Sequence, residues 1–154
     1  MTVRQLTIDD CQAVADLETQ LFDRCFDAAG LRELLGKPAF YGAVLQARDT
    51  PTTIHSYCLA FITSMQADIL SIGTERTNQR RGFGKIILQY LIAVTEQHNV
   101  AKITLEVAAD NIPARRLYGS CGFHVSGIRK DYYYRGKNRC DGMIMVRHLD
   151  SAFP

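Results

Sequence analysis

Two closely spaced glycines, Gly82 and Gly84, stand between a pair of arginines and a strongly apolar stretch that is typical of a helix. Glycine lets a backbone pass close to a ligand because it has no Cβ atom. The first N–H groups of the following helix have no partner inside it, so they point outward at the positive end of the helix dipole. Arg80, Arg81 and Lys85 surround them with positive charge. The segment therefore predicts a cradle for a phosphate-bearing ligand.

Two common nucleotide-binding motifs do not fit this segment. A P-loop would need glycine at position 79 and serine or threonine at position 86, where Gln79 and Ile86 stand. The dinucleotide-binding motif would need a third glycine at position 87, which is Ile87. Taken alone, two glycines in this pattern more often form an ordinary turn before a helix, so a ligand site here needs support from the rest of the sequence.

Glu106, Tyr118 and Asn111 carry the other groups that could do chemistry. Residues 103–108 alternate between aliphatic and other side chains, so Glu106 projects from the face opposite the aliphatic ones. Its carboxylate is either a candidate base or a plain solvent-facing residue of a strand. Tyr118 is either a candidate proton donor or a half-buried helix residue. Asn111 is explained by capping of a helix that has Pro113 in its first turn.

One α/β domain spanning residues 1–154, with a mixed sheet, is predicted from the order of the expected elements. The hydrophobic periodicities predict strands at 2–6, 40–46, 54–63, 67–74, 103–108, 123–128 and 139–147. Helices are expected to begin at Thr7, Asp27, Gly84 and Asn111. A connection rich in tyrosine and arginine is expected between the last two strands.

The charges are divided unequally along the chain. Residues 1–77 carry 6 Lys and Arg against 10 Asp and Glu, whereas residues 78–154 carry 12 against 6. The basic half contains the glycine segment, so an anionic ligand is expected there. A net charge of only +2 argues against a dedicated nucleic-acid binder.

The five cysteines form neither a CxxC motif nor a cluster with histidine. This pattern predicts reduced thiols, a cytoplasmic protein and no bound metal. The N-terminus lacks the apolar region of a signal peptide, and the longest apolar stretch, 86–94, is too short to span a bilayer. No membrane association is expected.

Three segments, taken together and in this order, resemble the GCN5-related N-acetyltransferase family: residues 79–85, 105–107 and 111–123. The resemblance covers residues 66–147 strongly and 1–65 loosely. It is closest to the RimI type, which acetylates the N-terminal alanine of a bacterial ribosomal protein. It implies a mixed central sheet of about seven strands with four helices, split between the two central strands.

The resemblance also implies acetyl-CoA as co-substrate and assigns roles to individual residues. The diphosphate would lie on the backbone amides of Arg80, Arg81, Gly82, Phe83, Gly84 and Lys85. The pantetheine arm would run along Ile72, Gly73 and Thr74 and end near Asn111. Glu106 matches the general base of the family and Tyr118 its general acid.

A protein N-terminus is the acceptor that simple acid–base chemistry favours. An α-amine titrates near 8 and a lysine near 10.4, so at pH 7.4 roughly a quarter of the first is neutral against about a thousandth of the second. Tyr132 and Tyr133 resemble tyrosines that lie in a loop beside the incoming peptide in RimI-type enzymes, although they could equally just pack a hairpin. By the same resemblance, Phe26 stands on the acceptor side.

Four departures from the family pattern concern the acceptor side. Cys140 replaces an acidic residue, Ala108 an arginine, Gln66 a glutamate and Phe26 a tryptophan. A small amine or a lysine side chain therefore stays open as acceptor. A non-catalytic CoA-binding or RNA-associated module is the alternative of another class, but the presence of both Glu106 and Tyr118 favours an enzyme.

Overall fold

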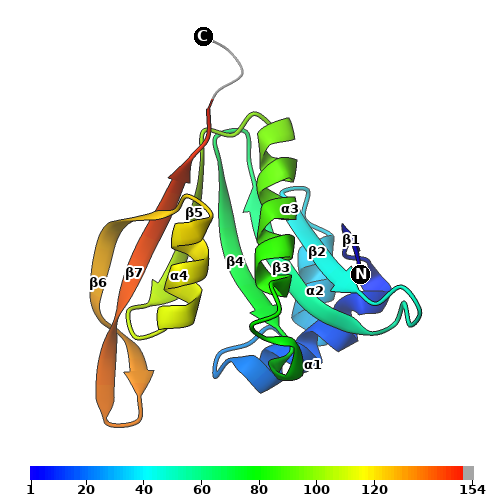
Figure 1. The fold of residues 1–154 in the computed structure, drawn as a ribbon, viewed down its shortest axis with the longest axis horizontal. Coiled ribbons are helices and arrows are strands. Elements are labelled where there is room, and N and C mark those ends of the chain that lie inside the picture. The colour runs from blue at the N-terminus through cyan, green and yellow to red at the C-terminus, as the bar shows by residue number, and fades with distance from the viewer. Residues whose placement is uncertain (151–154) are drawn as a thin grey trace.

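The computed structural model describes residues 1–150 and contains one seven-stranded sheet with four α-helices (Figure 1). The strands are β1 (Thr2–Gln5), β2 (Phe40–Gln46), β3 (Ile54–Ile62), β4 (Gln66–Thr74), β5 (Lys102–Ala108), β6 (His124–Arg135) and β7 (Asn138–His148). The α-helices are α1 (Cys11–Leu21), α2 (Ala28–Leu35), α3 (Phe83–Gln97) and α4 (Ile112–Ser120). Two short 3-10 helices, η1 (Ile8–Asp10) and η2 (Arg76–Asn78), precede α1 and α3.

The sheet has the order β1-β2-β3-β4-β5-β7-β6, and only the β4–β5 pair is parallel. Helices α3 and α4 cover one face, and α1 and α2 cover the other (Figure 1). Successive side chains of β3 point to opposite faces of the sheet. Cys58 and Ala60 join the core under α3 and α4. Tyr57 and Leu59 join the core under α1 and α2.

Polar side chains fix the helix starts that the sequence predicted. Asp27 accepts a hydrogen bond from the Gly30 N–H at 2.7 Å and begins α2. Asn111 Oδ1 accepts from the Ala114 N–H at 3.3 Å and begins α4. Both caps pair N–H groups that would otherwise lack a partner in the first turn. The predicted capping role of Asn111 is confirmed.

The sheet splits between β4 and β5. These strands pair only where residues 66–68 of β4 face residues 102–104 of β5, and beyond that point they diverge (Figure 1). At the closed end of the split, the Thr104 hydroxyl donates to Asp68 Oδ1. Opposite Leu59 and Ala60, β4 also carries a bulge at Leu70, which bends the strand. The predicted division of a seven-stranded sheet between its two central strands is confirmed.

The prediction of a tyrosine-rich connection between the last two strands is wrong. Strand β6 continues through Tyr132, Tyr133 and Tyr134 to Arg135, and β7 resumes at Asn138 after the two residues Gly136 and Lys137. Tyrosine favours strands, and the positive φ of Gly136, 61°, allows a tight hairpin turn. The tyrosines therefore belong to a long twisted hairpin. Within residues 1–150, no helix is long and apolar enough to cross a bilayer.

Candidate active site

A row of unpaired backbone N–H groups leads into the N-terminus of α3. From Arg80 to Lys85, no backbone N–H finds an acceptor within residues 1–150, and the first bond into the helix runs from Ile86 N–H to the Gly82 carbonyl at 3.1 Å. Arg80 and Gly82 both have left-handed backbone conformations, with φ of 63° and 82°. Such conformations gather successive N–H groups into a concave site for an anion.

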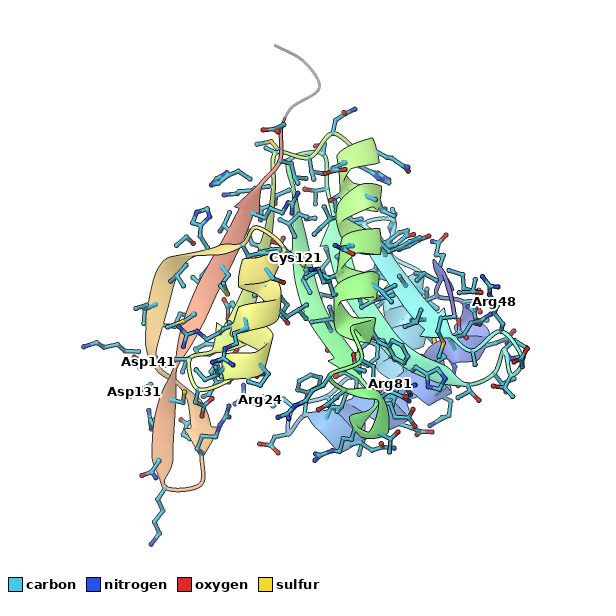
Figure 2. The ribbon with its side chains drawn as sticks, viewed as in Figure 1. Arg24, Arg48, Arg81, Cys121, Asp131 and Asp141 are labelled. Atoms are coloured by element: carbon cyan, nitrogen blue, oxygen red, sulfur yellow. The ribbon has the colours of Figure 1, made fainter. Side chains whose placement is uncertain are left out.

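The two glycines leave room at this site. A Cβ atom added to Gly82 would meet nothing within 4 Å, so the backbone there is open to a ligand. A Cβ atom on Gly84 would lie 3.2 Å from Leu117 Cδ2, so this glycine lets α3 approach α4 closely. Figure 2 shows Arg81 at this end of α3, where its Nη1 donates to Asn78 Oδ1 at 2.8 Å.

The side chains of residues 80–85 are not equivalent. Arg80, Arg81 and Lys85 are exposed and can add positive charge around an anion. Phe83 is buried, and its ring lies 6.0 Å from that of His55. Phe83 can therefore offer a ligand its backbone N–H but not its side chain.

Ile72, Gly73 and Thr74 lie on β4 beyond the last position that pairs with β5, so this edge of the strand is unpaired within the described chain. On the other edge, the Ser56 hydroxyl donates to the Gly73 carbonyl at 2.8 Å. A Cβ atom on Gly73 would lie 2.7 Å from Tyr57 Oη, so a larger residue does not fit. The free edge can receive hydrogen bonds from an extended arm, as in strand addition.

Glu106 projects from β5 on the face that α1 and α2 cover. Its neighbours Leu105 and Val107 point to the opposite face and pack under α3 and α4. About a third of the Glu106 side chain, 34%, is exposed. Arg129 of β6 forms an ion pair with it, with 2.9 Å between Arg129 Nε and Glu106 Oε1. Arg129 is not evident from the sequence, because its partner lies on a strand that is distant in sequence.

Tyr118 of α4 lies on the other face of the sheet, in the core under α3 and α4. Its ring centre lies 6.0 Å from that of Phe123. Within residues 1–150, every fully buried side-chain oxygen has a hydrogen-bond partner. The Tyr118 hydroxyl has none in this range, so it is not fully buried and reaches solvent. Burial, followed by the influence of Cys58 and Tyr133, raises the pKa of Tyr118, so the phenol is protonated at neutral pH.

Tyr133 connects these two groups. Burial and then the charge of Glu106 raise the pKa of Tyr133, and Tyr133 in turn contributes to the raised pKa of Tyr118. Tyr133 therefore lies within electrostatic range of both. Tyr132 packs edge-on against Tyr133 with 5.1 Å between ring centres. Both tyrosines therefore lie near the Glu106–Arg129 pair.

Phe26 lies on the segment that joins α1 to α2. It is half-buried, and its N–H donates to Glu18 Oε2 at 3.3 Å. Arg24 of the same segment lies below α4, between the two halves of the sheet (Figure 2). Asp23 of this segment also influences the pKa of Arg135 in the hairpin, so the two lie within electrostatic range of each other.

Glu18 is the centre of a buried hydrogen-bond network that was not predicted from the sequence. Only 1% of this residue is exposed. Its Oε1 accepts hydrogen bonds from Tyr57 Oη at 2.6 Å and from Ser71 Oγ of β4. The signal in the sequence was a carboxylate on the apolar stripe of α1, in line with Val14 and Leu21. The network ties α1 to the bulged part of β4 at the split.

The model of the acetyltransferase (GNAT) family matches residues 12–123. The chain belongs to this family. It is 33% identical over 140 residues to the N-alpha-acetyltransferase RimI of Mycobacterium tuberculosis, a match that covers 86% of this chain and 84% of that protein. It is also 34% identical over 91 residues to the ribosomal protein bS18-alanine N-acetyltransferase of Escherichia coli. That alignment covers 59% of this chain and only 62% of the E. coli protein.

Solved GNAT structures agree with this fold. The crystal structure of the E. coli ribosomal-protein-S18-alanine N-acetyltransferase superposes with a TM-score of 0.88 and 25% identity, over 98% of this chain and 95% of that one. Arabidopsis thaliana NAA60, in complex with a bisubstrate analogue, gives a TM-score of 0.85 at 14% identity over 98% and 99% of the two chains, which supports the fold alone.

All five cysteines carry free thiols. In residues 1–150, no group of three or more His, Cys, Asp or Glu side chains is arranged to hold a metal ion. Cys140 lies in β7 on the hairpin, and its thiol faces the Asp141 carbonyl at 3.4 Å.

Proposed function

We propose that this protein transfers an acetyl group from acetyl-CoA to the N-terminal α-amine of a protein, and that the acceptor is the N-terminal alanine of ribosomal protein bS18. The row of unpaired N–H groups at residues 80–85, next to the free edge of β4, carries the proposal. A diphosphate joined to an extended amide arm needs these two features side by side. The name of the E. coli relative supports the alanine of bS18 as acceptor, and the name of the M. tuberculosis relative supports an α-amine.

Each group of residues has a separate task in this proposal. The amides of residues 80–85 bind the diphosphate, with Arg80, Arg81 and Lys85 adding charge. The edge formed by Ile72, Gly73 and Thr74 aligns the pantetheine arm, and Asn111 stands at the start of α4 near its acetyl end. Phe26, Tyr132 and Tyr133 hold the acceptor peptide on the Glu106 side of the split.

Acetyl-CoA supplies the activated thioester carbonyl. Glu106, directly or through a water, takes a proton from the acceptor amine, whose lone pair then forms the N–C bond. As the C–S bond breaks, Tyr118 donates to the departing sulfur. Because the pKa of Tyr118 is raised and that of an ordinary thiol is about 8.5, hydrogen-bond donation to the thiolate is easier than complete proton transfer. The split lets both residues reach one substrate from opposite faces of the sheet.

Thiol release from acetyl-CoA tests the function directly. One peptide begins with a free alanine and contains no lysine; the other has a blocked N-terminus and one free lysine. We expect release only with the first, and mass spectrometry should locate the acetyl group on its α-amine. Release only with the second peptide, or only with a small amine such as spermidine, would reject the N-terminal acceptor but keep the acetyltransferase. No direct contact with nucleic acid is proposed, and a cytoplasmic location stays a prediction.

A further inference from the structure

Arg129 contacts the candidate base but has no role in the chemistry above. Its Nε lies 2.9 Å from Glu106 Oε1, and its guanidinium lies over the Tyr132 ring, 5.4 Å from the ring centre. Arg129 thus holds the carboxylate in an ion pair, and the exposed third of the Glu106 side chain leaves it open to an acceptor amine or a water.

A bulge in β6 holds Arg129 in this position. Arg129 pairs with Gly142 of β7 and Tyr133 pairs with Cys140, so residues 130–132 face the single residue Asp141. Asp131 has a left-handed conformation, with φ of 53°, and its N–H donates to Asp141 Oδ1 at 2.9 Å. Figure 2 shows Asp131 and Asp141 near each other where β6 and β7 cross.

Gly142 makes room for the bulge. A Cβ atom at this position would lie 3.2 Å from Tyr133 Cε2 and 3.4 Å from Tyr132 Cβ. The bulge is therefore built into both strands of the hairpin. It sets Arg129 against Glu106 and the Tyr132 ring against the guanidinium.

The charge of Arg129 changes what Glu106 does to an amine. A lone carboxylate beside an ammonium group stabilises the protonated form, which has no lone pair and cannot attack a carbonyl. A guanidinium already paired with the carboxylate opposes that effect. The pair presents an oxygen that can accept a proton, but little net charge that would trap an ammonium ion.

We propose that Arg129 is a positioning residue: by neutralising Glu106 it lets a bound acceptor α-amine lose its proton near neutral pH. The inference rests on the proposed function and adds one residue to the same site. Beside the pair, Tyr133 of β6 is influenced by Tyr132, Cys140 and Arg135, and Arg135 is itself paired with Asp110 at 3.2 Å. Across the split, Glu18 is buried and bonded to Ser71.

The test is the pH dependence of kcat with the alanine-starting peptide, for wild type, Arg129→Met and Arg129→Lys. The rising limb of this profile reports groups in the enzyme–substrate complex. Arg129→Met should move that limb to higher pH by about one unit, at the low end of shifts caused by a neighbouring charge because the pair is partly exposed. Arg129→Lys, which keeps the charge, should restore the wild-type limb. Lys130→Met, which removes an exposed neighbouring charge, serves as the matched control and should leave the limb in place.

The outcomes distinguish failure of the proposed function from failure of the role of Arg129 alone. If wild type does not acetylate the peptide, the proposed function fails and the role of Arg129 fails with it. If wild type is active and Arg129→Met loses rate equally at every pH without moving the limb, Arg129 only supports the structure and this inference alone is overturned. The same conclusion follows if Lys130→Met moves the limb as far as Arg129→Met.

Discussion

The phenol of Tyr133 lies within electrostatic range of the Glu106 carboxylate. Burial is the main cause of the raised pKa of Tyr133, and the charge of Glu106 is the second cause. Tyr133 also contributes to the raised pKa of Tyr118, which sits on the other face of the sheet. The two strands β4 and β5 separate after residues 66–68 and 102–104, between these two faces. We therefore expect the candidate base and the candidate proton donor to belong to one site.

Replacing Glu106 by glutamine should lower turnover while leaving the affinity for acetyl-CoA close to that of wild type. The amide keeps the shape of the side chain but cannot take a proton, so kcat should fall by about a hundredfold or more, as expected for general-base catalysis. Steady-state kinetics and calorimetry with desulfo-CoA measure the two effects. Glu96→Gln, on the exposed face of α3, should behave as wild type. A large loss of cofactor affinity in Glu106→Gln would instead show a structural role.

Replacing Tyr118 by phenylalanine should reduce kcat by roughly ten- to ten-thousand-fold, the range found when a proton donor is removed. The ring and its contact with Phe123 remain, so thermal unfolding should change little. Tyr90→Phe, which removes a hydroxyl bonded to Tyr41 Oη at 3.4 Å far from the split, is the control and should retain full activity. Wild-type rates in Tyr118→Phe would remove the hydroxyl from the mechanism.

Sequence patterns predicted those parts of the fold that depend on neighbouring residues. The caps at Asp27 and Asn111 are local, and alternation along β5 placed Glu106 on the correct face. The length of the last hairpin was predicted wrongly, because three successive tyrosines carry both strand propensity and the polar character of a loop. Pairing with β7 makes these tyrosines part of a strand rather than a loop. That pairing includes a bulge, which the periodicity of the sequence does not indicate.

Contacts between distant segments could not be predicted in the same way. Arg129 meets Glu106, 23 positions away, because β7 lies between β5 and β6 in the sheet. Glu18 meets Ser71 because the bulge in β4 presents that hydroxyl to α1. In both cases an ordinary-looking charged residue acquires its partner through sheet order, which the sequence alone left undetermined.

Tyr57→Phe should lower the free energy of unfolding at neutral pH by about 1–3 kcal/mol, because Glu18 loses a hydrogen bond inside the protein. It should also change the response to alkali. Burial and then Glu18 raise the pKa of Tyr57, so above about pH 10, where an unfolded tyrosine ionises, the native protein binds more protons than the unfolded chain. The wild-type free energy of unfolding must therefore fall as pH rises through this range.

The variant should show a shallower fall, although not a flat line, because burial also raises the pKa of Tyr41 and Tyr118. Urea unfolding at pH 8 and pH 10.5 would measure both slopes. Tyr134→Phe, at an exposed position of the hairpin, is the control and should follow wild type. Equal slopes for wild type and Tyr57→Phe would show that Tyr57 ionises as readily in the folded protein as in the unfolded chain.

Gly84→Asp should weaken binding of desulfo-CoA by about a hundredfold or more. The new Cβ would lie 3.2 Å from Leu117 Cδ2, and the new carboxylate would add negative charge next to the N–H groups proposed to bind the diphosphate. Two like charges about 5 Å apart repel by about 3 kcal/mol at an effective dielectric constant of 20. Gly84→Ala brings only the steric contact, so its smaller loss would separate crowding from charge. Gly119→Asp puts the same charge on α4, where a Cβ atom meets nothing within 4 Å, and should bind as wild type. If calorimetry showed undiminished binding to Gly84→Asp, the diphosphate would have to lie elsewhere than on the amides of residues 80–85.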